Sequence, residues 1–266
     1  MILSSSPVRD DARLLRQFRL ALQSGAIGPH YQPEVDFDRP DWMGFEALSR
    51  WRNAESGDIS PAVFIPLAEQ HGLLAELTMR QINDLALDAP LLTQRFDQVA
   101  LAFNLSATLL GHGGIQDALA RAVGVCRDLP LTWEVEITET EPIVDFGATR
   151  AQLNHWRELG VKIVLDDFGT GWSNWVRTEL LPVDRIKIDS AFVRDLPSAR
   201  VQAVLREIRA RALAQDIELT VEGVETAEQE IRLRAMGFTR FQGWLYAKAM
   251  PLTEVLASSG FLKQGL

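Results

Sequence analysis

Short apolar segments alternate with longer amphipathic segments along most of this 266-residue chain. Eight of the short segments have the length and composition of β-strands, at residues 27–35, 43–51, 99–106, 131–139, 161–167, 183–189, 217–223 and 238–246. Helical segments lie between them, for example at residues 61–72, 148–160, 199–215 and 226–237. Such alternation is typical of parallel βαβ units. Eight strands in about 250 residues predict an α/β fold, a (β/α)8 TIM-type barrel.

The first two predicted strands are joined only by a short acidic turn, DFDRPD at residues 36–41. This turn leaves no room for the crossover helix that a parallel connection requires, so we expect the first strand of the barrel to be antiparallel. No repeat or internal domain boundary is visible after the N-terminal segment. Residues 1–18 are interpreted as a linker and the start of a helix, and residues 19–266 as one domain.

The composition limits the classes of function. With a net charge of −9 and a pI of about 5.0, the chain lacks the basic surface that binding of a nucleic acid polymer normally needs. The single cysteine, Cys126, cannot form an intrachain disulfide, which fits a reducing setting. No apolar run approaches the ~20 residues of a membrane span, and the N-terminus does not resemble a secretory signal. We therefore expect a cytoplasmic domain without membrane contact.

Polar residues occur near the C-terminal ends of seven predicted strands, each of which is otherwise mainly apolar. They are Glu46, Asn104, Glu136, the adjacent pair Asp166 and Asp167, Lys187, Glu222 and Gln242. In a barrel of parallel strands, the C-terminal ends meet at one mouth, where the active sites of this fold lie. Residues that are far apart in the sequence are therefore predicted to form one ring.

This ring of acids predicts a metal site. Four or five carboxylates at low effective dielectric would repel one another by several kcal/mol without a cation. The histidines fall outside these strand ends, except His30 on the first strand, and no cysteine–histidine spacing resembles a zinc site. Carboxylate and amide oxygens suit Mg²⁺ or Mn²⁺. Because the chain turns at a strand end, Asp166 and Asp167 could serve two cations, which lie about 3.5–4 Å apart in typical two-metal sites.

Two alternatives fit parts of the pattern. The stretch KIVLDDFG, residues 162–169, resembles the magnesium-binding loop of protein kinases, but the other loops that a kinase needs are missing. Lys187 could form a Schiff base, as in barrel aldolases, although that chemistry has no use for a ring of acids.

A set of short motifs resembles the EAL-domain family of cyclic di-GMP phosphodiesterases. The motifs are YQP (31–33), FEALSRW (45–51), FIPLAE (64–69), FNLS (103–106), EITET (136–140), DDFGTG (166–171), LPVDRIKID (181–189), VEGVET (221–226) and QGW (242–244). One tripeptide is weak evidence. The order and spacing of the whole set, which extends over nearly the whole chain, are highly specific.

The resemblance implies a barrel with an antiparallel first strand and a phosphodiesterase activity. Active members of the family hydrolyse cyclic di-GMP to linear pGpG with Mg²⁺ or Mn²⁺, and Ca²⁺ inhibits them. A homodimer is expected, as is an origin within a larger multidomain protein of bacterial signalling. The rival is a receptor that binds cyclic di-GMP without cleaving it. Such members have lost metal ligands, whereas every motif position that can be checked here is intact.

The resemblance also assigns ligands. Glu46, Asn104, Glu136 and Asp166 are expected to bind one metal ion, with Asp167 serving the second. Substrate contacts are expected from Gln32, Glu46, Leu48, Arg50, Asn104, Asp166, Lys187 and Gln242.

Catalytic roles follow the same resemblance for Glu222, Lys187, Asp167 and Glu139. Glu222 is expected to act as the general base or its orienting partner, and Lys187 to steady the attacking water and the phosphate. Glu139 is expected to hold the loop after the fifth strand. Its odd spacing from Glu136 turns its side chain to the other face of the strand, which disfavours a shared metal.

Overall fold

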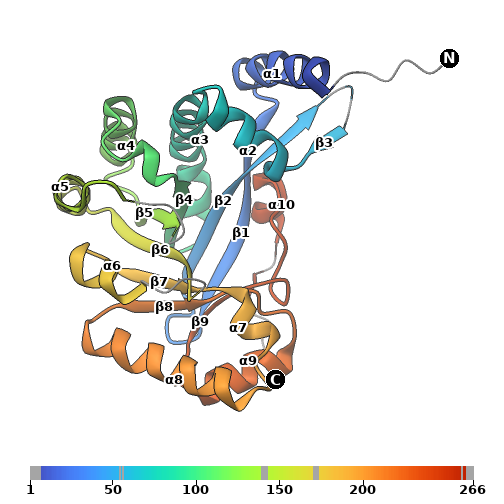
Figure 1. Cartoon of the computed structure of the whole chain (residues 1–266). Helices are drawn as coiled ribbons and strands as arrows, with labels where there is room; N and C mark the ends of the chain where they lie inside the picture. Colours follow the sequence, from blue (N-terminus) through green and yellow to red (C-terminus); the bar gives the residue numbers. More distant parts are fainter. Residues whose placement is uncertain are drawn as a thin grey trace.

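The computed structural model describes residues 7–53, 55, 57–138, 143–169, 174–258 and 260–261. Within these ranges, eight strands form a closed barrel with helices around it (Figure 1). The barrel strands are β1 (Ile27–Asp36), β2 (Trp42–Asn53), β4 (Gln98–Leu105), β5 (Leu131–Thr138), β6 (Lys162–Phe168), β7 (Arg185–Ile188), β8 (Glu218–Val221) and β9 (Arg240–Gln242). A further strand, β3 (Gly57–Ile59), pairs with the end of β2 as a hairpin. The predicted (β/α)8 TIM-type barrel is confirmed.

The order around the barrel is β1-β9-β8-β7-β6-β5-β4-β2, and β2 pairs with β1 to close it. β1 runs antiparallel to both of its neighbours, whereas the other barrel strands pair in parallel. In the turn before β2, the Trp42 N–H donates to the Arg39 carbonyl at 3.0 Å, and the Asp36 carboxylate accepts from the Asp38 N–H at 3.1 Å. These pairing directions confirm the predicted antiparallel first strand. The physical reason is that so tight a turn can only reverse the direction of the chain.

Helices surround the strands (Figure 1). They are α1 (Pro7–Ser24), α2 (Pro61–Gln70), α3 (Leu74–Arg95), α4 (Gly113–Val125), α5 (Phe146–Glu158), α6 (Asn174–Leu180), α7 (Ser190–Arg194), α8 (Ala199–Ala214), α9 (Ala227–Ala235) and α10 (Leu252–Ala257), with a 3₁₀ turn at Ala107–Leu109. Side-chain caps set several helix starts, as where Thr226 and Gln229 form a capping box at α9. None of the described helices is long and apolar enough to cross a membrane.

The main apolar core lies between the barrel and the helices. Phe45 and Ala47, which flank Glu46 on β2, both belong to it. Alternate residues of a strand point to opposite faces, so the residue between them points into the barrel. A smaller core packs α1 and α2 against the end of β2, where Phe18 on α1 and Trp51 on β2 have ring centroids 5.4 Å apart. The domain boundary predicted after residue 18 falls inside α1.

Two strands differ from the sequence prediction. β3 was not predicted, and β9 covers residues 240–242 instead of 238–246. The chain leaves β9 at Gly243 and wraps around Val224, whose carbonyl accepts from the Leu245 N–H at 3.0 Å. A Cβ atom at Gly243 would overlap the Val224 backbone. This close approach fixes the end of β9 beside the end of β8.

Candidate active site

Lys187 on β7 lies at the centre of a cluster of carboxylates at the C-terminal ends of the strands. Its side chain is fully buried. The ammonium nitrogen is 2.9 Å from Glu46, 3.1 Å from Glu136, 2.7 Å from Glu222 and 3.7 Å from Asp166. These residues come from five different strands or strand ends, and the structure brings them together as the sequence predicts.

Two side-chain amides hold Glu46 from the neighbouring strands. Asn104 on β4 donates to one carboxylate oxygen at 2.8 Å, and Gln242 on β9 donates to the other at 2.7 Å. With Lys187, both oxygens of Glu46 are occupied by donors. The amides therefore orient Glu46 in the mouth of the barrel.

Adjacent acids at the end of β6 both belong to this cluster. The φ angle of Asp167 is 56°, in the left-handed region, and its N–H donates to Asp166 Oδ1 at 2.9 Å. The register between β6 and β7 shifts between Leu165 and Phe168. The regular alternation of side chains is thus broken, and two consecutive carboxylates can serve one site.

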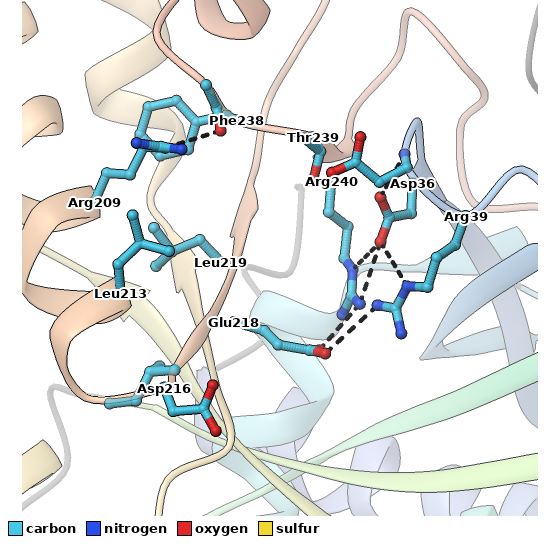
Figure 2. A pocket seen from close by; sticks show the side chains of 13 residues that line it. Asp36, Arg39, Arg209, Leu213, Asp216, Glu218, Leu219, Phe238, Thr239 and Arg240 are labelled. Carbon is cyan, nitrogen blue, oxygen red and sulfur yellow. Dashed lines mark hydrogen bonds and ion pairs between the residues drawn. The ribbon is translucent and has the colours of Figure 1, made fainter.

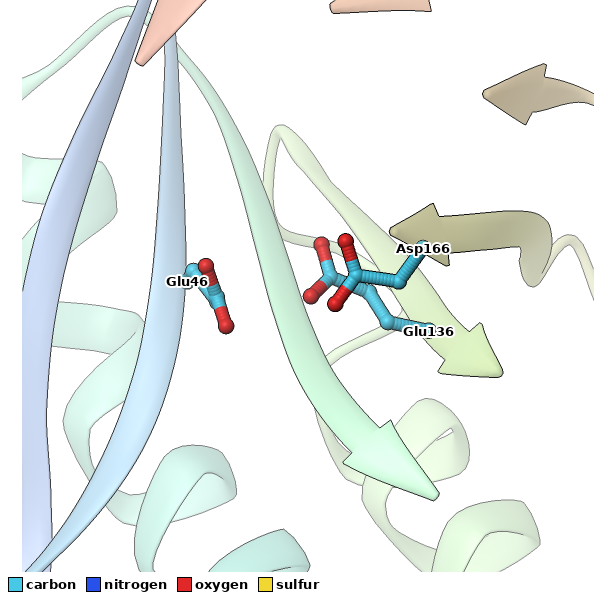
Figure 3. Close-up of side chains that lie close together, drawn as sticks. All are labelled: Glu46, Glu136 and Asp166. Atoms are coloured by element: carbon cyan, nitrogen blue, oxygen red, sulfur yellow. The ribbon is translucent and has the colours of Figure 1, made fainter. Parts of the chain in front are cut away.

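The acids form two groups that share Asp166. Oxygen atoms of Glu46, Glu136 and Asp166 all lie within 4.8 Å of one another, and the three side chains face one another across the barrel (Figure 3). The second group is Asp166, Asp167 and Glu222, with the same limit. Two oxygen-rich groups with one shared carboxylate match the arrangement of a two-cation site.

The charge balance of the cluster favours a cation. Burial is the largest cause that raises the pKa of Glu136, Asp166 and Glu222, the last to about 8, although Lys187 opposes it. Burial and Asp166 raise the pKa of Asp167 to about 6. Burial acts in the same direction on Glu46, but Lys187 and the amide hydrogen bonds outweigh it and lower that pKa to about 2. One lysine therefore does not neutralise these acids.

Two buried acceptors indicate where a cation fits. Glu136 Oε1 and Gln242 Oε1 have no hydrogen-bond partner within the described part of the chain. Buried oxygen atoms without a donor are costly unless a water or an ion satisfies them. Carboxylate and amide oxygens are the ligands of Mg²⁺ and Mn²⁺, so the residues present fit a divalent cation of this kind.

The predicted substrate contacts on β1 and β2 lie beside this cluster. Gln32 is the register partner of Glu46. Leu48 and Arg50 line a cavity of about 280 Å³ together with Asn104, which connects the cavity to the cluster. Arg50 is partly buried, donates to the Ser49 carbonyl at 3.0 Å, and has its pKa lowered mainly by burial. Glu139 lies outside the described residues.

A second cavity, of about 380 Å³, is lined by the end of β1 at Asp36 and the starts of β8 and β9 at Glu218 and Arg240, so it lies at the end of the barrel away from Lys187. Figure 2 shows the side chains that line it. Four of its charged side chains pair with one another: Asp36, Arg39, Glu218 and Arg240. Arg240 is 3.4 Å from Asp36 and 3.0 Å from Glu218, and Arg39 is 3.5 Å from Glu218. The cavity lacks an unbalanced cluster of acids, so the mouth with Lys187 is the candidate active site.

Sequence reasoning missed one set of buried polar residues. Glu34, Glu134, Arg185 and Thr220 are all buried within the barrel, below the cluster around Lys187. The sequence indicates on which face of their strands two of these residues lie, but not which charges pair. Glu134 precedes Glu136 by two residues, and Arg185 precedes Lys187 by two, so each pair shares a face of its strand.

Comparisons with known proteins agree with this geometry. The EAL domain family profile matches residues 15–249. The chain is 32% identical over 257 residues to the bifunctional diguanylate cyclase/cyclic di-GMP phosphodiesterase MucR of Pseudomonas aeruginosa, covering 94% of this chain and 37% of MucR. It is 34% identical over 234 residues to the cyclic di-GMP phosphodiesterase PdeR of Escherichia coli, covering 88% of this chain and 35% of PdeR. The chain thus spans about a third of the length of these relatives.

Solved structures match at similar levels. The PaMucR phosphodiesterase in complex with c-di-GMP superposes with a TM-score of 0.82 at 31% identity, covering 91% of this chain and 99% of that one. The EAL enzyme Bd1971 with bound cAMP and cyclic-di-GMP gives a TM-score of 0.83 at 28% identity, covering 95% and 70%. With its barrel, its motif order and these matches, the chain belongs to the EAL domain family.

Proposed function

We propose that this domain is a phosphodiesterase that hydrolyses cyclic di-GMP to linear pGpG and so lowers the level of this second messenger in bacterial signalling. The observation that carries the proposal is the pair of carboxylate groups that share Asp166 around the buried Lys187. We infer the identity of the substrate from relatives that are named as cyclic di-GMP phosphodiesterases and from a related domain solved with c-di-GMP.

We assign the cation sites to the two oxygen-rich groups. Glu46, Asn104, Glu136 and Asp166 would hold one Mg²⁺ or Mn²⁺, and Asp167, with Asp166 and Glu222, would hold the second. Bound cations supply Lewis acidity toward the phosphate and lower the pKa of water. Ca²⁺ is expected to inhibit, because it is larger and accepts looser geometry than Mg²⁺.

The protein's own side chains position the phosphate and move the proton. The carboxylates around Lys187 raise its pKa well above the ordinary value against the effect of burial, so it stays protonated and can donate to a phosphate oxygen. Glu222, 2.7 Å from Lys187, would use one carboxylate oxygen for the second cation and the other to accept the proton of the attacking water, or to orient the group that accepts it. Arg50, on the wall of the adjoining cavity, can bind a phosphate through two N–H groups.

The remaining substrate contacts are assigned to the same mouth. Gln32, Leu48 and Gln242 would border the bound dinucleotide, since they flank Glu46 or line the cavity next to it. A homodimer belongs to the proposal through the family resemblance alone, and a cytoplasmic location through the expectation drawn from the sequence. Glu139 is assigned to the order of the loop after β6 through the family resemblance.

The competing function is a receptor that binds cyclic di-GMP without cleavage. Intact acids at every motif position favour the enzyme. Separation of the nucleotide products after incubation with cyclic di-GMP and Mg²⁺ tests the proposal, with EDTA as the control. Linear pGpG that forms with Mg²⁺ or Mn²⁺, and not with EDTA or Ca²⁺, is the expected result. Tight binding with no product under any of these metals would instead identify a receptor.

A further inference from the structure

Below Lys187, the barrel contains a second buried cation with its own carboxylate partners. Arg185 lies two residues before Lys187 on β7, and its side chain is 1% exposed. Nη1 of Arg185 is 3.0 Å from Oε2 of Glu34 on β1, and Nη2 contacts Glu134 on β5. In the sheet order, β8 and β9 separate β7 from β1, and β6 separates β7 from β5. These contacts therefore cross the interior of the barrel.

The same strands supply residues to both levels. β5 carries Glu134 below and Glu136 above, and β8 carries Thr220 below and is followed directly by Glu222 above. The Thr220 hydroxyl lies 3.3 Å from Oε2 of Glu34, to which it donates. We call Glu34, Glu134, Arg185 and Thr220 the lower charge layer. Two residues of strand span roughly 6.6 Å, so this layer lies directly beneath the candidate metal ligands.

A charged layer at this place calls for an explanation. The interior of a TIM-type barrel is normally filled with branched apolar side chains, which pack well without directional contacts. A buried ion pair gains little stability over an apolar replacement, because both partners lose their hydration. The planar guanidinium of arginine, however, fixes the direction of its partners in a way that apolar side chains do not.

On one side of β7, the ladder to the neighbouring strand is irregular. β7 consists of four residues, and its pairing with β6 is irregular between Leu165 and Phe168, next to Asp166. β7 pairs regularly with β8, but the spacing between Lys187 on β7 and Asp166 on β6 is not set by a regular ladder. Contacts from Arg185 to β1 and β5 hold the start of β7 relative to strands across the barrel.

We propose that Arg185 is a positioning residue for the divalent-cation site, because it fixes β7 relative to β1 and β5 beneath Lys187 and Glu136. The inference rests on the proposed metal binding of this domain. The lower charge layer then maintains the spacing of the metal ligands and does not itself contact the substrate.

The test replaces the three charges together. In the triple variant Glu34→Gln, Glu134→Gln and Arg185→Met, side-chain size is nearly kept and no buried charge is left without a partner, so the fold is expected to survive. Mn²⁺ binding is measured by calorimetry, and the spectrum of bound Mn²⁺ by electron paramagnetic resonance, next to the melting temperature. Loss of outer-shell support typically weakens metal binding about 10–100-fold, and we expect a loss of at least about tenfold with an altered spectrum.

The matched control is Asp36→Asn with Arg240→Met, which removes another buried ion pair of the barrel, 3.4 Å long, at the end away from Lys187 (Figure 2). Its Mn²⁺ affinity is expected to stay within about twofold of the parent. A triple variant that binds Mn²⁺ like the parent, or a control that loses as much affinity, would overturn the inference.

If the triple variant does not fold, the single variant Arg185→Lys takes its place. It keeps the charge but loses the two-pronged contact, and unchanged Mn²⁺ affinity and spectrum there would also overturn the inference. A parent protein that binds no Mn²⁺ would contradict the proposed function itself, which separates the two failures.

Discussion

The ammonium nitrogen of Lys187 lies 2.7 Å from Oε1 of Glu222, and the two side chains come from the ends of neighbouring strands. Without a metal, this lysine is the positive charge that the surrounding carboxylates share. Loss of Lys187 would leave several buried acids without a counter-charge. The free-energy cost of these unpaired charges exceeds the stabilisation that the ion pairs themselves provide.

Lys187→Met is therefore expected to lower the free energy of unfolding of the metal-free protein by roughly 3–5 kcal/mol. Mn²⁺ should recover part of this loss, because a cation replaces the missing charge, while hydrolysis stays abolished. Urea unfolding with EDTA and with Mn²⁺ measures the effect. Lys162→Met is the control, since that lysine is half exposed and has one ion pair of 3.6 Å, to Asp184. Equal stability of Lys187→Met and the parent in EDTA would contradict the shared-charge role.

Glu46→Gln is expected to abolish most of the activity. Loss of an outer-shell partner already costs about 10–100-fold, so loss of a direct ligand should lower kcat/KM by at least about 100-fold. The pKa of about 2 shows that its contacts favour the charged form of Glu46, so the neutral variant should also melt somewhat lower at pH 7. Product formation and melting temperature are compared with Glu254→Gln, an exposed acid on α10. Wild-type turnover in Glu46→Gln would show that the metal assignment is wrong.

Metal affinity is expected to rise with pH. In the metal-free protein, the pKa values of Asp167 and Glu222 are raised to about 6 and about 8, so both bind a proton below these values. A cation must displace those protons. The apparent affinity for Mn²⁺ should increase up to about pH 8, by about tenfold per pH unit for each proton released, and most steeply below pH 6. Calorimetry from pH 5 to 8 checks this, and Asp167→Asn should lose the steep part below pH 6. A flat profile would rule out both carboxylates as ligands.

Glu139→Ala is expected to lower kcat severely and to weaken Mg²⁺ binding while the fold is retained. The prediction comes from the sequence: the odd spacing of Glu139 from Glu136 disfavours a shared metal, and the family resemblance expects Glu139 to hold the loop after Asp167. Glu139→Gln, which keeps an acceptor oxygen, should be milder. Steady-state kinetics at limiting Mg²⁺ separates the variants, and wild-type kinetics of the alanine variant would leave Glu139 without a functional role.

The ring at the mouth was predictable because strand polarity alone brings it together. Each of its members lies late in an apolar segment, and parallel strands deliver such residues to one end. The sequence also predicted that Asp166 and Asp167 can both serve the site because the chain turns at the strand end, and the left-handed φ of Asp167 provides that turn.

The lower charge layer was not predicted, because it depends on contacts across the barrel. Arg185 and Glu34 are 151 residues apart, and nothing local in either strand indicates which charge lies opposite. The early end of β9 has the same origin, since it follows from the close approach of Gly243 to the Val224 backbone. Tertiary contacts decided both features.

The reversed direction of β1 determines where the N-terminal helix joins the barrel. Ile27, at the start of β1, pairs with Trp51 near the end of β2, so the chain enters beside the mouth and not at the opposite end. α1 packs there through Phe18, against α2, whose residues Pro61 and Ile65 line the cavity that contains Arg50. A displacement of α1 would therefore be transmitted through α2 to the cavity that contains Arg50, because α1 joins the barrel at the mouth and not at the opposite end.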